Sequence, residues 1–354
     1  MRIVVTGNMG YVGPVVVHHL RAEFPDAELV GFDLGLFAPA LTSAGPLPET
    51  VLDAQLFGDV RNLPPNLLRD VDAVVHLAAI SNDPMGHRFE AVTSAINHQA
   101  SVALASAAQK AGVRHFAFAS SCSVYGASDG LPRREGDPVA PLTAYAQSKI
   151  ATEEALLELP PRGMTITCLR FATACGFSPR LRLDLVLNDF VASALATSEI
   201  AVLSDGTPWR PLINVTDMAR AIEWAITRDA GGPIVVNAGS DDWNYSVRDL
   251  AEAVAADMSD VSVSINMAAP PDRRSYKVDF SLYSRLAPNH QPRSTLKATI
   301  SDLARGLRSL GFADRDFRRS KLVRLHVLTA LIDEGHLSPA LRWSQARRIE
   351  SAAA

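Results

Sequence analysis

The sequence has few of the features that mark secreted, membrane-spanning or nucleic-acid-binding proteins. It holds 3 cysteines in 354 residues, an odd and sparse set that does not form a disulfide framework and indicates a reducing compartment. No apolar run reaches the roughly 18 residues that a bilayer-spanning helix needs. The net charge of −4 and the lack of a long basic run argue against nucleic acid and anionic membranes as partners.

Two further absences bear on the cellular location and on metal binding. The chain enters a β-branched run without a basic and then apolar leader, so we expect a cytoplasmic protein. No group of potential metal ligands is apparent, since His18 and His19 are adjacent and would point apart on a helix. What remains is an ordinary globular composition, 47% apolar and 20% charged, with enough length for one large or two modest domains.

The start of the chain carries a pattern typical of dinucleotide binding. A β-branched run over residues 2–6 leads into Gly7-x-x-Gly10-x-x-Gly13, with Pro14 in the first turn of a predicted helix. Such glycines let the backbone approach a pyrophosphate, whose charge the helix N-terminus favours. Asp33 ends the next predicted strand, 20 residues after Gly13. A carboxylate there binds both ribose hydroxyls and repels a 2′-phosphate, so we predict NAD rather than NADP.

Strands and helices then alternate, which predicts an α/β fold with a doubly wound parallel sheet. We expect further strands over residues 55–60, 71–77, 113–119 and 164–170, with helices over 89–111 and 143–159. Polar or small residues follow several of these strands, where ligands of such sheets bind. Asp59 is placed to meet the adenine amino group, although it is equally interpretable as a turn aspartate.

A candidate catalytic pair lies on the second of these helices. Tyr145 and Lys149 are four residues apart, so they share one helical face. A nearby ammonium favours the phenolate of a tyrosine, and a phenolate can take a proton from a substrate hydroxyl and later return it. Alone the pattern is weak, because exposed tyrosines and lysines on surface helices are common.

Taken together, these motifs resemble the extended short-chain dehydrogenase/reductase family, in its nucleotide-sugar epimerase/dehydratase branch. The matching residues keep the family's order over roughly residues 1–280: the glycine turn, Asp33, Gly58-Asp59-Val60, His76-Leu77-Ala78-Ala79, Ser120-Ser121-x-Ser123-Val124-Tyr125-Gly126, Tyr145-x-x-x-Lys149, Leu169-Arg170-Phe171, Trp209-Arg210-Pro211-Leu212-Ile213-Asn214-Val215-x-Asp217 and Arg274-Ser275-Tyr276-x-Val278-Asp279.

The resemblance implies roles for individual residues. Ser121 would orient the sugar hydroxyl toward Tyr145, and Lys149 would hold the nicotinamide ribose. The implied NAD-binding residues are Gly7, Met9, Gly10, Tyr11, Val12, Gly13, Asp33, Asp59, Val60, Leu77, Ala78, Ala79, Tyr145, Lys149 and Phe171. The implied contacts to a nucleotide-diphosphate sugar are Ser81, Ser121, Ser123, Thr173, Arg180, Arg210 and Arg274. Forked guanidinium donors suit a diphosphate.

Departures from the family pattern bear on the reaction. The 4,6-dehydratases carry Asp-Glu after the catalytic hydroxyl residue, whereas this chain has Cys122-Ser123. The cysteine of the 3,5-epimerases would fall at Ser123, so we expect Cys122 to face away as a small buried side chain. Thr173 stands where the family has asparagine, and Cys175 replaces a tyrosine and is expected to pack.

The resemblance also implies an organisation and an activity. Residues 1–170 would form the NAD-binding Rossmann domain, residues 171–315 a smaller, interleaved substrate domain, and residues 316–354 a tail with an amphipathic helix over 317–341. Helices 89–111 and 143–159 would pair in a homodimer. We expect a nucleotide-sugar epimerase, at C4, that oxidises and re-reduces its substrate. The alternatives are a 4-ketoreductase or dehydrogenase with net NAD(P)H turnover, and a non-catalytic NAD-binding regulator.

Overall fold

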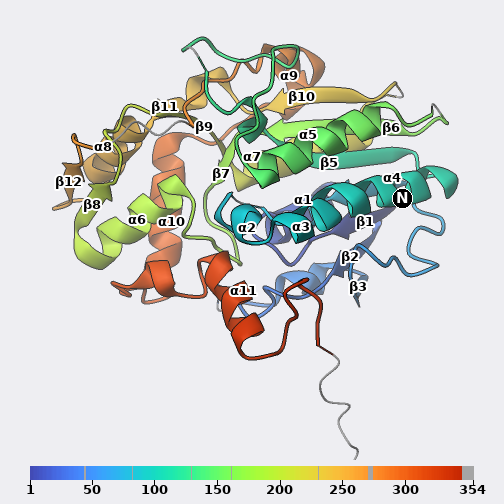
Figure 1. The fold of residues 1–354 in the computed structure, drawn as a ribbon, viewed down its shortest axis with the longest axis horizontal. Helices are drawn as coiled ribbons and strands as arrows, with labels where there is room; N and C mark the ends of the chain where they lie inside the picture. Colours follow the sequence, from blue (N-terminus) through green and yellow to red (C-terminus); the bar gives the residue numbers. More distant parts are fainter. Residues whose placement is uncertain are drawn as a thin grey trace, which may run out of the picture.

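A seven-stranded sheet is the centre of the molecule (Figure 1). The structure is a computed structural model, and it describes residues 1–344 except 44, 82, 129, 161, 230 and 270–273. All neighbouring strands of the sheet are parallel. Their spatial order is β10 (Ile234–Ala238), β6 (Thr165–Phe171), β5 (His115–Ser121), β4 (Ala73–His76), β1 (Arg2–Thr6), β2 (Glu28–Asp33) and β3 (Ala54–Phe57). This order confirms the predicted doubly wound sheet, with its switch point between β1 and β4.

The strands are apolar on both faces because helices cover both. Ile3 and Val5 pack into one core with α1 (Gly13–Glu23) and α7 (Val215–Thr227). Val4, between them in β1, faces a second core with α4 (Ser101–Lys110) and α5 (Ala144–Leu157). Successive side chains of a strand point to opposite faces, so a run of β-branched residues serves both cores.

The predicted helix over residues 89–111 is interrupted. It consists of α3 (Glu90–Thr93), a π-helical turn, η2 (Ser94–Ala100), and then α4. The short α2 (Asp83–Arg88) precedes it. A π turn widens the helix locally and is frequent at functional sites. Here it lies beside α5, the helix that carries Tyr145 and Lys149.

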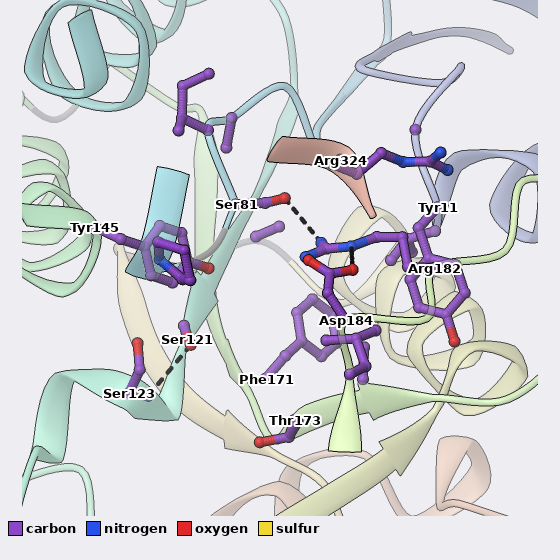
Figure 2. Close-up of a pocket in the computed structure, with 18 of the residues that line it drawn as sticks. Tyr11, Ser81, Ser121, Ser123, Tyr145, Phe171, Thr173, Arg182, Asp184 and Arg324 are labelled. Atoms are coloured by element: carbon purple, nitrogen blue, oxygen red, sulfur yellow. Dashed lines mark hydrogen bonds and ion pairs between the residues drawn. The ribbon is translucent and has the colours of Figure 1, made fainter. Parts of the chain in front are cut away.

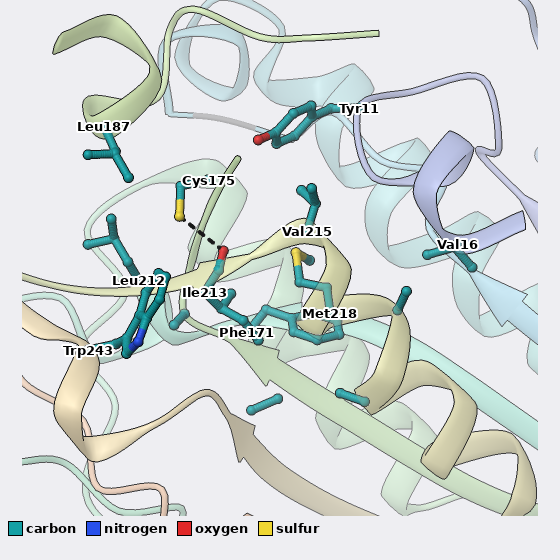
Figure 3. Close-up of a cluster of buried hydrophobic side chains, with 14 of the residues drawn as sticks. Tyr11, Val16, Phe171, Cys175, Leu187, Leu212, Ile213, Val215, Met218 and Trp243 are labelled. Atoms are coloured by element: carbon teal, nitrogen blue, oxygen red, sulfur yellow. Dashed lines mark hydrogen bonds between the residues drawn. The ribbon is translucent and has the colours of Figure 1, made fainter. Parts of the chain in front are cut away.

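A smaller part of the molecule, the predicted substrate domain, is built from segments that alternate with the main sheet. One small sheet joins β7 (Thr173–Cys175), β9 (Trp209–Asn214) and β11 (Asn244–Ser246), and another joins β8 (Glu199–Val202) and β12 (Ser262–Ile265). Helices α6 (Val186–Thr197), α8 (Val247–Asp257) and α10 (Leu296–Ser309) pack on one another. The chain returns to the main sheet for α7 and β10, so the predicted interleaved arrangement is confirmed. Figure 3 shows the apolar contact between the two parts, where Phe171 and Met218 lie near Leu212 and Cys175.

The remaining elements are short. They are η1 (Pro48–Val51), η3 (Cys122–Tyr125), η4 (Asp241–Trp243), α9 (Ser281–Leu286), η5 (Pro288–His290), η6 (Phe317–Arg319) and α11 (Arg324–Asp333). The helix predicted over residues 317–341 is therefore only partly right. Gly335, with a φ of 74°, lies just after α11, and Leu337 then bridges antiparallel to Trp343. Within residues 1–344, apart from the gaps given above, no helix is long and apolar enough to cross a membrane. Residues 345–354 of the predicted tail lie outside the described residues.

Candidate active site

A cavity of about 750 Å³ opens at the carboxyl ends of the main strands. This volume is within the range of small-molecule and cofactor sites. Its wall includes the glycine turn and Asp33 on the Rossmann side, Tyr145 and Lys149 on α5, and Arg210 of the substrate domain. Figure 2 shows a close-up of the cavity, with Ser121, Ser123 and Tyr145 toward one side and Tyr11 toward the other.

The glycine turn fits a dinucleotide. Gly7 has a φ of 75°, and a Cβ there would collide with the backbone of Ala78, just as a Cβ on Gly13 would collide with Asn8. Glycine at these points lets the turn pack closely, and the residues at the N-terminus of α1 line the cavity, where they suit a pyrophosphate. Residues from this turn, Asp33 and Lys149 therefore meet the requirements of NAD within one cavity.

Asp33 is held rigidly at the end of β2. Its carboxylate accepts hydrogen bonds from the backbone amides of Met9, at 3.0 Å, and Gly35, at 2.7 Å. Burial raises the pKa of Asp33 from its ordinary value, while these amides oppose the shift. The fixed carboxylate stands beside the glycine turn, as the recognition of a ribose diol requires.

Tyr145 and Lys149 project from the first turns of α5, which begins after Thr143. The Thr143 hydroxyl accepts a hydrogen bond from the amide of Ala146 at 3.2 Å and so caps the helix. The Lys149 ammonium lies 5.6 Å from the centre of the Tyr145 ring and donates to the carbonyl of Ala119 at 2.6 Å. Burial lowers the pKa of Lys149 to about 8, against an opposing effect of Glu153. The ammonium is thus still charged at neutral pH, next to the phenol.

Ser121 and Ser123 lie where β5 turns into η3. The Ser121 hydroxyl accepts from the amide of Ser123 at 3.2 Å, and both serines line the cavity. The Ser123 hydroxyl is buried and has no hydrogen-bond partner among the described residues. A substrate hydroxyl would satisfy it, because buried polar groups are rarely left unpaired. Cys122 faces away as predicted, with its thiol 3.0 Å from the carbonyl of Arg170.

Asn97, in the π turn, is a positioning residue that sequence reasoning missed. Its side chain bonds the amide and the carbonyl of Ile80, at 2.8 and 2.9 Å, and reaches the Ser148 hydroxyl at 3.1 Å. Ser148 in turn donates to the carbonyl of Tyr145 at 2.7 Å. The loop after β4 is therefore tied to α5, the helix that carries Tyr145. The sequence signal that could have indicated Asn97 is a polar amide side chain among the small residues of the predicted helix over residues 89–111.

A buried ion pair fixes α5 on the sheet. Glu153, one turn beyond Lys149, pairs with Arg170 of β6 at 2.7 Å and also accepts from the Ser120 hydroxyl. Both charged side chains are almost fully buried. On the other side of Lys149, His76 bonds Thr6 and Ser101, and burial lowers the pKa of His76 to about 3. His76 is therefore neutral and adds no charge beside the ammonium.

Most of the predicted site residues line this one cavity. Those brought together are Gly7, Gly10, Tyr11, Val12, Gly13, Asp33, Asp59, Val60, Leu77, Ala78, Ala79, Ser81, Ser121, Ser123, Tyr145, Lys149, Phe171, Thr173, Arg210 and Arg274. Two others are not among the lining residues. Met9 is buried, with its amide taken by Asp33. Arg180 is 1% exposed and forks onto Glu49 at 2.5 and 3.1 Å, so the substrate contact predicted for it needs correction.

Two more features of the wall depart from expectation. Asp59 is held by the guanidinium of Arg61 at 2.6 Å, which leaves less of its carboxylate for an adenine amino group. Arg182, rather than Arg180, faces the cavity, where it donates to Ser81 at 2.9 Å and pairs with Asp184 (Figure 2). Arg180 lies in a turn at residues 179–180 and Arg182 follows just after it, so spacing alone could not choose between them.

Comparisons with known proteins agree with this geometry. The sequence model of the NAD-dependent epimerase/dehydratase family matches residues 3–239. A UDP-glucose 4-epimerase from Azospirillum brasilense is 30% identical over 271 residues, which cover 67% of this chain and 72% of that protein. Among solved structures, MoeE5 in complex with UDP-glucuronic acid and NAD is 26% identical, with a TM-score of 0.74 over 87% of this chain and 99% of MoeE5. The NAD-dependent NDP-hexosamine 5,6-dehydratase TunA is 25% identical, with a TM-score of 0.75 over 89% of this chain and 99% of TunA.

Proposed function

This chain belongs to the NAD-dependent epimerase/dehydratase family, and we propose that within it the protein is a nucleotide-sugar 4-epimerase. Its relatives include both epimerases and dehydratases, so it is an NAD-dependent enzyme of nucleotide sugars, and the proposal concerns the reaction and the carbon. The observation that carries it is the meeting of Ser121, Tyr145 and a buried Lys149 on one cavity with the glycine turn and Asp33. Uridine diphosphate sugars are the first substrates to test, because the 30% identical relative is named a UDP-glucose 4-epimerase.

The chain's own residues supply the proton chemistry of such a reaction. The Lys149 ammonium, 5.6 Å from the Tyr145 ring, stabilises the phenolate, which takes the proton of the sugar hydroxyl and later returns it. Ser121 would orient that hydroxyl. NAD held by the glycine turn, Asp33 and Lys149 would supply the acceptor and donor of the hydride at the sugar carbon. Arg210 and Arg274 line the cavity. They would hold the diphosphate while the keto sugar rotates between its oxidation and its re-reduction.

Dehydration is disfavoured because the cavity wall lacks a suitable acid among the described residues. Burial raises the pKa of Cys122 well above its ordinary value, and Ser123 is an alcohol. The aspartates of that wall are already engaged. Asp33 accepts two backbone amides, and the remaining three, Asp59, Asp184 and Asp189, pair with Arg61, Arg182 and Arg318. None is placed as a carboxylic acid that could protonate a leaving hydroxide.

The proposal is tested by incubating the purified protein with UDP-glucose, UDP-galactose and their N-acetyl and uronic acid forms in deuterated water, without added cofactor. A 4-epimerase interconverts C4 epimers, and NMR finds protium at C4, because the hydride returns without exchanging with solvent. Deuterium at C3 or C5 would identify deprotonation there, and accumulation of NADH would identify a dehydrogenase. Either outcome, or no reaction with any of these sugars, contradicts the proposal.

Tyr145→Phe separates catalysis from binding. Loss of one proton-transfer group costs about 10²- to 10⁴-fold in rate, while the affinity for NAD stays close to that of the wild type. Ser123→Ala is a useful companion, because Ser123 lines the cavity beside Ser121 but is not proposed to transfer a proton. An equal fall in turnover for both variants would contradict the role given to Tyr145. The predicted homodimer and cytoplasmic location remain predictions.

A further inference from the structure

The C-terminal segment, residues 317–344, lies against the dinucleotide side of the cavity. It is beyond residues 3–239, which the family model matches. Leu328, Leu337 and Leu341 are fully buried in the core that also holds Phe32 and Val60. From Leu328 onward the segment is therefore packed on the NAD-binding half, whereas its start is held to α6 by the pair of Arg318 with Asp189 (Figure 1).

Arg324, the first residue of α11, reaches the cavity wall from this segment. Its side chain is 1% exposed. The guanidinium donates to the carbonyls of Arg180 and Lys321, at 2.7 and 3.4 Å, and lies 4.8 Å from the centre of the Phe37 ring. No carboxylate of the described residues comes within ion-pair distance of it.

The surroundings of Arg324 carry a surplus of positive charge. Arg180 pairs with Glu49, and Arg182 pairs with Asp184, so two nearby guanidiniums are balanced and the third is not. Burial, followed by the charge of Arg182, lowers the pKa of Arg324 to about 9. A buried and unpaired cation is costly. An anion in the cavity would remove that cost.

The position of Arg324 indicates which anion it would bind. Phe37, which it covers, lies in the loop after β2, four residues beyond Asp33. Figure 2 shows Arg324 toward the same side of the cavity as Tyr11, a residue of the glycine turn. The arginines expected to hold the substrate diphosphate, Arg210 and Arg274, belong to the substrate domain. We propose that Arg324 is an anion-binding residue of the dinucleotide site and that its ligand is the pyrophosphate of NAD.

The end of the segment fastens Arg324 in place and closes over the neighbouring loops. Arg61 donates to the carbonyls of Ala340 and Leu341, at 2.7 and 3.0 Å. The Trp343 indole donates to the carbonyl of Leu34 at 2.8 Å. The bond to Leu34 joins the segment to the loop after β2, and the bonds from Arg61 join it to the loop after β3. Both loops flank the expected adenosine site.

The test compares the affinities of Arg324→Met and Arg324→Gln for adenosine, ADP, NAD and UDP, by calorimetry on nucleotide-free protein. Arg319→Met is the matched control, because Arg319 lies in the same segment with 82% of its side chain exposed. We expect Arg324→Met to bind ADP and NAD about 10- to 100-fold more weakly, the value of a charge-assisted hydrogen bond. Adenosine, which has no phosphate, and UDP should bind as in the wild type. The Arg324→Met protein as purified should also contain less NAD.

Three results would overturn the proposal. Unchanged affinity of Arg324→Met for ADP and NAD would show that no phosphate meets Arg324. A fall in UDP affinity alone would assign Arg324 to the sugar nucleotide. Tighter binding of NADP than of NAD, lost in Arg324→Met, would place a 2′-phosphate there. If Arg324→Met does not fold, Arg324→Gln decides, since it removes the charge but keeps a polar side chain, and an ADP affinity equal to wild type would refute the assignment. The proposal for Arg324 rests on NAD as the cofactor and does not depend on which sugar reaction the protein catalyses. The nucleotide-binding experiment can therefore refute it while the 4-epimerase proposal stands, and the reverse is also true.

Discussion

Lys149→Met is predicted to stabilise the nucleotide-free protein while it removes activity. The ammonium is 3% exposed, and burial moves its pKa from 10.5 to about 8. At roughly 1.4 kcal/mol per pKa unit, holding this charge in the folded state at pH 7 costs about 3 kcal/mol. Methionine removes the charge but leaves the carbonyl of Ala119 without its donor, a loss of about 1 kcal/mol. The net gain expected at pH 7 is about 2 kcal/mol.

The pH dependence gives this prediction its sharper form. The folded-state pKa of Lys149 lies below the unfolded-state value, so between pH 8 and 10.5 the unfolded state binds more protons and the wild type gains stability as the pH rises. The charge cost in the wild type is therefore full below about pH 8 and vanishes by about pH 10.5. The variant's net gain of about 2 kcal/mol should accordingly shrink over this range and end as a loss of about 1 kcal/mol, the missing hydrogen bond to Ala119. Other titrating groups are common to both proteins and cancel in the comparison.

Urea unfolding of nucleotide-free protein at pH 7 and pH 10 measures both quantities. Lys110→Met makes the same chemical change at the exposed end of α4 and should shift the free energy of unfolding by less than about 0.5 kcal/mol at either pH. A Lys149→Met protein that is less stable than the wild type at pH 7, or a difference that does not shrink with pH, would refute the reasoning. The expected result would show a charge kept at a cost in stability for its effect on Tyr145.

Two further substitutions test the supports of the site. Asp33→Ser removes the carboxylate expected to repel a 2′-phosphate, so the preference for NAD over NADP, measured by calorimetry, should fall about 10-fold or more; an unchanged ratio would mean that another group sets it. Glu153→Gln breaks the buried pair with Arg170 and leaves that guanidinium uncompensated, so the free energy of urea unfolding should fall by about 3–5 kcal/mol. Glu154→Gln, on the exposed face of the same helix, is the control, and a loss no larger than in this control would refute the structural role of the pair.

Local sequence predicted the elements whose signals are local. The strand over Arg2–Thr6 has the predicted bounds, and β2 ends at Asp33 as predicted, because each is a run of mainly apolar residues with turn-forming residues after it. The order of strands and helices was enough to infer a parallel sheet, and a parallel sheet brings the ends of its strands to one edge. That is why Ser121, Tyr145 and the glycine turn could be expected on one cavity.

The features that the sequence did not predict depend instead on partners that are distant in sequence. The π turn at Asn97 depends on bonds to Ile80 and Ser148, which are 17 and 51 residues away. The contrast between Arg180 and Arg182 depends on Glu49, 131 residues from Arg180. Propensity and periodicity carry no information about such partners, so a sequence-based reading could name the right residue types and still choose the wrong arginine.

By itself the sequence determined the doubly wound sheet, the glycine turn with its acidic partner, and the helical spacing of Tyr145 and Lys149, because backbone geometry and short-range spacing decide these features. Only the tertiary structure decided which charges are balanced and which face the cavity. It paired Arg180 with Glu49 and Arg61 with Asp59, and it brought Arg324 from the C-terminal segment to the dinucleotide side. The physical reason is that the electrostatic character of a buried group depends on the distances to its neighbours in space, and these are fixed only when distant parts of the chain pack together.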